Sequence, residues 1–200
     1  GKTVIAATVI EALFFGSDRF DFAPDPGAVV IWFSDDPNLN DQSRFRLMQA
    51  SEKLTWDRLV HVRPPFAKRR LEPGKVYFLN TQRLSSTSLL TRGYVESDTD
   101  VELEGFKEAA PPDGLAWNIW QTIDNTILDS ELTVYFVLDE AHRGFDTRAS
   151  ADRSTIVRRL VAGDSARRAM PIVLGISATI GRFKKAMDTA EASGKRLALP

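Results

Sequence analysis

The sequence predicts a three-layer α/β domain with a mainly parallel central sheet. Short, continuous apolar runs occur at 28–33, 76–79, 132–138 and 172–176, and segments with helical spacing lie between them. Such runs are typical of strands that are buried on both faces, and helices usually connect parallel strands. Polar residues that could bind a ligand or take part in catalysis follow several of these runs. Because ligands bind at the carboxyl ends of the strands in such sheets, we expect one site there.

Composition limits the classes of protein that the sequence can represent. The 200 residues are enough for one domain, 43% are apolar and 26% are charged, as in ordinary globular proteins. The absence of cysteine excludes disulfides and thiolate metal sites. No apolar run approaches the roughly 20 residues that span a bilayer, so we expect no membrane partner. A net charge of −1 gives no overall basic character. We expect one domain over 1–200 in a cytoplasmic, bacterial or archaeal setting.

The first half of the chain is expected to begin with a helix. Thr3–Phe15 is apolar on most sides, and Gly16 follows it as a stop signal. After a loop and the strand 28–33, Asp41 is expected to cap a helix that runs to about Leu54. A weaker strand is expected at 59–62. Pro73-Gly74 then forms a turn before the strand 76–79.

The second half is expected to contain an insertion. Residues 85–114 are polar and acidic, which predicts a mobile insertion or long loop within the domain. Residues 115–128 predict a helix with Trp117 and Trp120 on one side, a pattern more typical of a core than of base stacking. Further helices are expected at 150–161 and 182–192.

Asp139-Glu140-Ala141-His142 is the most informative segment, because it follows the strongest predicted strand. Two adjacent carboxylates at a strand end are costly to bury without a partner. A magnesium ion with a bound nucleotide is a natural partner. Asp139 can hold the ion, commonly through water, and Glu140 can orient and deprotonate an attacking water molecule.

Two further motifs supply the rest of such a site. Gly1-Lys2-Thr3 precedes the first helix, where a lysine can reach the β- and γ-phosphates and a threonine hydroxyl can ligate magnesium. The start of a helix adds partial positive charge for the phosphates. Ser177 and Thr179 follow the last strand, and their hydroxyls could hydrogen-bond the Asp139–His142 segment. Together the motifs predict a site for ATP and Mg²⁺.

The order GKT, DEAH and SAT resembles the first RecA-like lobe of a superfamily 2 DEAD/DEAH-box helicase, which is a P-loop NTPase fold. IWFSDDP at 31–37 and YFLNTQRL at 77–84 resemble further elements of the restriction-type members, and Phe183 also fits. The combination is most similar to the Res (motor) subunits of type III restriction enzymes. The resemblance covers nearly the whole chain.

The resemblance implies an ATP-hydrolysing DNA helicase or translocase and gives each motif a role. Lys2 would bind phosphate with Gly1, Thr3 and Asp139 would hold Mg²⁺, and Glu140 would activate water. His142, Ser177 and Thr179 would couple the nucleotide state to the nucleic-acid side. The residues expected to touch the DNA backbone are Ser34, Pro37, Asn80, Thr81 and Gln82. A second RecA-like lobe and possibly a methyltransferase or specificity subunit would be partners.

The chain departs from the phosphate-loop pattern G-x-x-x-x-G-K-[ST], of which Gly1 would be the second glycine. We therefore expect a fragment that begins inside this loop and lacks a strand from inside the sheet. Such a fragment would bind ATP poorly and be weak or inactive alone.

Two other functions stay open. One is a non-helicase P-loop ATPase or nucleotide-driven switch, and the other is an inactive interaction module that keeps the fold. We expect His61 to be structural, because no cluster of metal ligands accompanies it.

Overall fold

A computed structural model describes residues 1–34, 37–91, 116–139 and 151–176 of the chain, with only the backbone given for 151–155. Within these ranges no helix combines the length and the apolar character needed to cross a membrane. The predicted helix at 182–192 lies outside the described residues, as does most of the predicted insertion.

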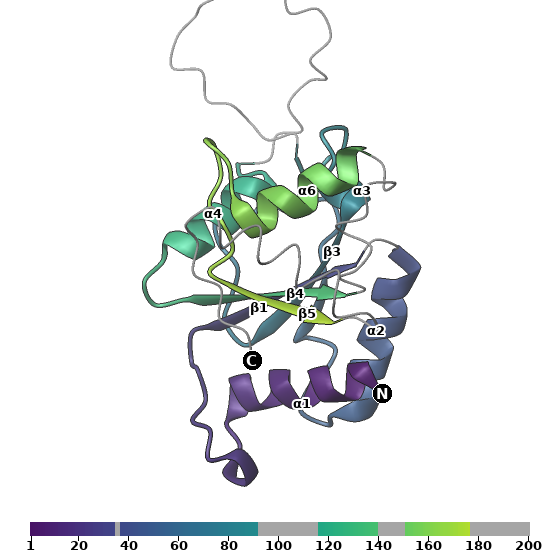
Figure 1. Cartoon of the computed structure of the whole chain (residues 1–200), viewed down its shortest axis with the longest axis vertical. Coiled ribbons are helices and arrows are strands. Elements are labelled where there is room, and N and C mark those ends of the chain that lie inside the picture. The colour runs from purple at the N-terminus through teal and green to yellow at the C-terminus, as the bar shows by residue number, and fades with distance from the viewer. Residues whose placement is uncertain (35–36, 92–115, 140–150, 177–200) are drawn as a thin grey trace, which may run out of the picture.

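The centre of the domain is a five-stranded sheet in which all paired strands are parallel (Figure 1). The strand order is β2-β3-β1-β4-β5. The strands are β1 (Ala28–Ser34), β2 (Leu59–His61), β3 (Lys75–Asn80), β4 (Thr133–Asp139) and β5 (Ile172–Ile176). The predicted α/β class with a parallel sheet is confirmed.

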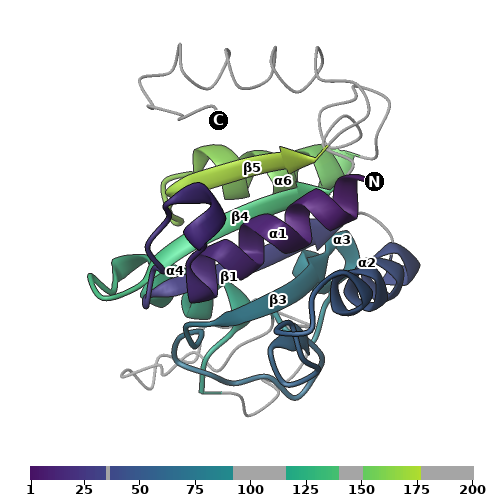
Figure 2. The same ribbon diagram turned by 90° about the horizontal axis from the view of Figure 1, so that it is seen from below.

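Helices cover both faces of the sheet, because successive side chains of a strand point to opposite faces. Ala28, Val30 and Trp32 pack against α1 (Lys2–Phe15) and α2 (Pro37–Ala50). The alternate residues of β1 pack against α4 (Ile119–Leu128) and α6 (Ala151–Ala162). Figures 1 and 2 show these helix pairs on either side of the sheet. Two apolar cores therefore enclose β1, all seven residues of which are buried.

The predicted boundaries of the second helix are wrong. The helix α2 begins at Pro37 and ends at Ala50, and residues 51–54 form a turn after it. Proline suits the first position of a helix, because its φ angle is already helical and no intrahelical partner exists there for an N–H. Asp41 therefore lies inside the helix, and its carboxylate contacts His61.

The helix α4 also begins later than predicted, at Ile119. Asn118 accepts a hydrogen bond from the backbone N–H of Gln121, whose side chain accepts one from the N–H of Asn118. This reciprocal pair fixes the start of the helix and leaves Trp117 before it. Trp120 lies in the core as predicted, with 6% of its surface exposed.

The sheet contains no internal gap among the described strands, since every neighbouring pair is hydrogen-bonded. The expectation that a strand is missing therefore stays a prediction, because such a strand would have to pair at an edge of the described strands. Within the described part of the chain, a further strand could pair only with the outer edge of β2 or of β5.

The first residues of the predicted insertion are packed into the domain. A short helix, α3 (Thr81–Leu84), follows β3, and Leu90 a few residues later is fully buried. The backbone N–H of Ile119 donates to the carbonyl oxygen of Leu90 at 2.7 Å. This hydrogen bond thus holds the residues just before 92–115 next to those just after it.

Candidate functional site

The N-terminus of α1 lies at the carboxyl-end edge of the sheet. In both views its first turn is beside the arrowheads of the strands (Figures 1 and 2). Gly1 is the N-cap residue, and its carbonyl oxygen accepts from the N–H of Val4 at 3.0 Å. The first turn of a helix directs its N–H groups and partial positive charge outward from this end, which favours anions.

A cavity of about 450 Å³ lies between this helix end, α2 and the end of β4. This volume is within the range of small-molecule sites. Its lining brings together the two motifs that the sequence singled out, although they lie far apart along the chain. The lining residues are Gly1, Lys2, Thr3, Val4, Leu39, Arg46, Gln49, Ala50 and Asp139.

Asp139 is the last residue of β4 and is partly exposed toward the cavity. The hydroxyl of Ser43 on α2 donates to its Oδ2 at 3.1 Å, which orients the carboxylate. No three acidic or histidine side chains within the described ranges form a metal cluster. Magnesium is often held by only one or two protein ligands, with phosphates and water completing its shell. Thr3 and Asp139 line the same cavity and are the residues that could contribute such ligands.

Two polar residues of this lining have no counterpart among the residues predicted from the sequence. Arg46 and Gln49 are exposed on α2 and line the cavity opposite Lys2. Arg46 adds a second cation, which suits a polyphosphate. Helical spacing in the sequence could have identified Arg46 as a lining residue, because Leu39, Arg46 and Ala50 share one face of α2.

The predicted nucleic-acid loops are linked by a buried asparagine. Asn40 accepts from the hydroxyl of Ser34 at 2.6 Å and donates through Nδ2 to the carbonyl oxygen of Leu79 at 2.9 Å. Asn80 in turn accepts from the N–H of Arg83 and caps α3. These bonds join the end of β1 to the end of β3.

The structure therefore separates the five predicted DNA-contact residues into two groups. Ser34 is fully buried and Asn80 is 4% exposed, so neither side chain reaches the surface. Gln82 is exposed, and Pro37 and Thr81 are partly exposed. Four other predicted site residues lie outside the described residues: Glu140, His142, Ser177 and Thr179.

His61, at the end of β2, is in a structural setting. Its ring stacks on Phe78 with 5.7 Å between centroids, and its Nε2 lies 2.8 Å from Oδ1 of Asp41. This Nε2 makes no aligned hydrogen bond, so the contact with Asp41 is electrostatic. Burial lowers the pKa of His61, and nearby arginines lower it further, while Asp41 opposes the shift.

The lowered pKa of His61 predicts a loss of stability in mild acid. The unfolded chain binds the proton more readily, so the stability from neutral His61 is present above pH 6.5. It is lost as the pH falls from there through the lower folded-state pKa. We expect the free energy of unfolding in urea to decrease over this interval, and His61→Gln to reduce the decrease. His142→Gln is the matched control, and an equal change in both variants would contradict the assignment.

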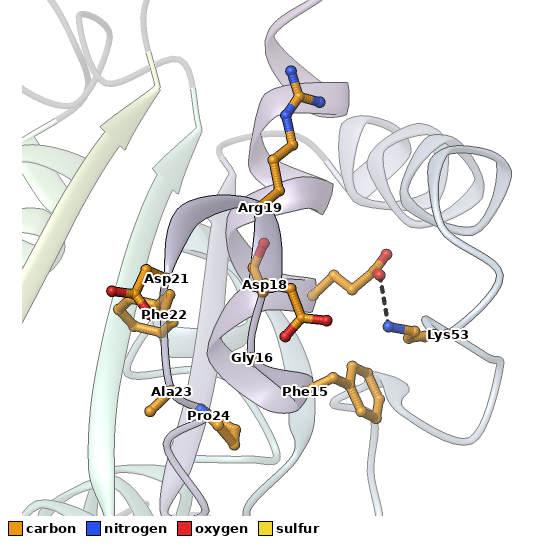
Figure 3. A pocket seen from close by; sticks show the side chains of 11 residues that line it. Phe15, Gly16, Asp18, Arg19, Asp21, Phe22, Ala23, Pro24 and Lys53 are labelled. Carbon is orange, nitrogen blue, oxygen red and sulfur yellow. Dashed lines mark ion pairs between the residues drawn. The ribbon is translucent and has the colours of Figure 1, made fainter.

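A second pocket, of about 620 Å³, lies at the other end of α1 (Figure 3). It is formed by the loop 16–24 and Lys53, which pairs with Glu11 at 3.1 Å. Asp18 and Asp21 also line it, and Arg19 extends away from Lys53 in Figure 3. It lies away from the carboxyl ends of the strands, and its acidic lining does not suit phosphate. The smaller cavity is therefore the better candidate for the predicted nucleotide site.

Comparisons with protein-family models, curated proteins and solved structures gave no match. The candidate site therefore rests on the sequence motifs and the geometry of this chain. The domain is an α/β domain with a five-stranded, all-parallel sheet, consistent with a Rossmann-like or P-loop-like fold.

Proposed function

We propose that this domain is the ATP-binding and ATP-hydrolysing lobe of a DNA helicase or translocase with a RecA-like P-loop fold. The observation that carries the proposal is the single cavity that Lys2 and Thr3 share with Asp139. A lysine at a helix start and a carboxylate at a strand end are the two halves of a magnesium–nucleotide site. The similarity of the motifs to type III restriction motors supports the choice of DNA as the track.

Each residue has a defined task in this proposal. Lys2 would bind the β- and γ-phosphates, and Arg46 would add charge on the opposite wall. Thr3 and Asp139 would hold Mg²⁺, whose charge offsets that of the phosphates. Glu140 would accept the proton of the attacking water. Ser43 would keep the carboxylate of Asp139 in position through the 3.1 Å hydrogen bond.

The burial of Ser34 and Asn80 favours a second candidate function. If these loops do not contact nucleic acid, the same cavity could serve a nucleotide-driven switch that acts on another protein. ATPase activity that rises on addition of DNA supports the motor. Activity that is unchanged by DNA supports the switch.

Lys2→Ala tests the nucleotide site itself. We expect the intact protein to lose about tenfold to a hundredfold in affinity for a fluorescent ATP analogue with Mg²⁺, because charge-assisted hydrogen bonds to the phosphates are removed. Fluorescence titration measures the affinity. Lys53→Ala is the matched control, since this lysine lies at the opposite end of α1. Equal affinity in the wild type and Lys2→Ala would contradict the proposal.

A further inference from the structure

A surface beside the candidate site gathers three arginines and a tryptophan from four segments. Arg44 is on α2, Trp56 follows it, Arg63 follows β2, and Arg83 is on α3. Arg44 lies one helical turn after Asp41, whose carboxylate is 2.8 Å from His61, and Arg63 and Arg83 follow the neighbouring strands β2 and β3. We call these four residues the Arg–Trp surface. One of its members, Arg83, is next to Gln82 in α3.

Trp56 is the most unusual member of the Arg–Trp surface, because 55% of this large apolar side chain is exposed. The guanidinium of Arg44 lies 3.8 Å from the centroid of its ring, and Nη2 of Arg44 donates to the carbonyl oxygen of Trp56 at 3.3 Å. One face of the indole is therefore covered by a cation, which fixes its orientation. The exposed remainder is a flat aromatic surface available for stacking.

Two acidic residues, Asp41 and Asp57, lie near this surface, against its three arginines. Asp41 contacts His61, and Asp57 accepts a hydrogen bond from the hydroxyl of Thr55 at 2.6 Å. Arg63 is exposed, and Arg83 is partly exposed. In a chain with a net charge of −1, this is a local concentration of positive charge next to an aromatic ring. Cations beside an exposed aromatic ring match the phosphates and bases of a nucleic acid.

We propose that the Arg–Trp surface binds single-stranded DNA, with Trp56 stacking on a base and Arg63 and Arg83 contacting phosphates. The inference rests on the proposed motor function, and it places the contact on exposed side chains in place of the buried Ser34 and Asn80. A single strand fits better than a duplex, because the bases of a duplex are already stacked on one another. Phosphate and stacking contacts carry little base information, so binding would be independent of sequence.

The test is fluorescence anisotropy with a labelled oligothymidylate and the intact protein. We expect Trp56→Ala to weaken binding by about fivefold to a hundredfold, as alanine substitution of base-stacking aromatics does. We expect the double variant Arg63→Gln with Arg83→Gln to flatten the dependence of log affinity on log salt, by about 0.7 for each phosphate that the protein no longer neutralises. Arg158→Gln is the matched control, because this exposed arginine lies on α6, across the sheet. Arg44 is left unchanged, since its Nε is buried.

The outcomes separate this inference from the proposed function. Affinities equal to that of Arg158→Gln would overturn the Arg–Trp surface, and so would an equal loss of affinity for a blunt duplex. The same variants are titrated with the fluorescent ATP analogue, and we expect no change. If the wild type binds the nucleotide but no oligothymidylate, this inference fails while the nucleotide site stands. If it binds the oligothymidylate through these residues but no nucleotide, the proposed function fails and the surface stands.

Discussion

Replacing Glu140 with glutamine is expected to reduce ATP turnover by about a hundredfold to ten-thousandfold, which is the usual contribution of a general base. ATP binding should persist, because the amide keeps the shape of the side chain but cannot accept the proton of the attacking water. The residue directly before it, Asp139, lines the cavity together with Lys2 and Thr3. The change should therefore appear in the turnover number while the affinity for nucleotide is preserved.

A steady-state ATPase assay on the intact protein measures the effect of Glu140→Gln. Glu131→Gln is the matched control, since Glu131 is exposed two residues before the start of β4, at the opposite end of the strand. Turnover close to that of the wild type would show that Glu140 is not the base. A parallel loss of nucleotide affinity would instead indicate that the carboxylate contributes to binding.

Replacing Asn40 with alanine is expected to lower the free energy of unfolding by about 2–4 kcal/mol. The change would remove the buried hydrogen bonds of Asn40 with the Ser34 hydroxyl and the Leu79 carbonyl, each worth about 0.5–1.5 kcal/mol, and would add the cost of a gap in the packing. Domains of this size are stable by only about 5–15 kcal/mol, so the loss is substantial. Urea unfolding followed by circular dichroism measures it.

The control for Asn40→Ala is Gln42→Ala, because Gln42 is exposed on the same helix. Both variants replace a side-chain amide on α2 with alanine, so the difference between them isolates the buried hydrogen bonds. If both variants unfold at the same urea concentration, the link between β1 and β3 contributes nothing measurable to stability.

The strands could be predicted because burial on both faces leaves a direct trace in the sequence. Ala28–Ser34 reads as a continuous apolar run because α1 and α2 cover one side of β1, and α4 and α6 cover the other. The placement of Asp139 at a strand end followed from the same kind of run. That Lys2 and Asp139 line one cavity also followed from general rules, since the helix start and the strand end lie at the same edge of a parallel sheet.

Tertiary contacts decided what the sequence pattern could not. Pro37 can break a strand or begin a helix, and only the packing of α2 against the sheet shows that it begins one. Asn40 resembles an ordinary polar helix residue, yet its partner Leu79 lies 39 positions away along the chain. The roles of Ser34, Asn40 and Arg46 depend on the order β3-β1-β4, which no local pattern encodes.

The hydrogen bond between Leu90 and Ile119 has a consequence for protein engineering. Because this hydrogen bond brings the two ends of the intervening segment together, the packing of the described domain depends little on how many residues that segment contains. Doubling the number of residues in a loop with fixed ends costs only about 0.6 kcal/mol in closure entropy. The stretch 92–115 is therefore a suitable position for grafting a fluorescent reporter or an affinity tag, and natural relatives would be free to differ in length there without altering the sheet or the cavity.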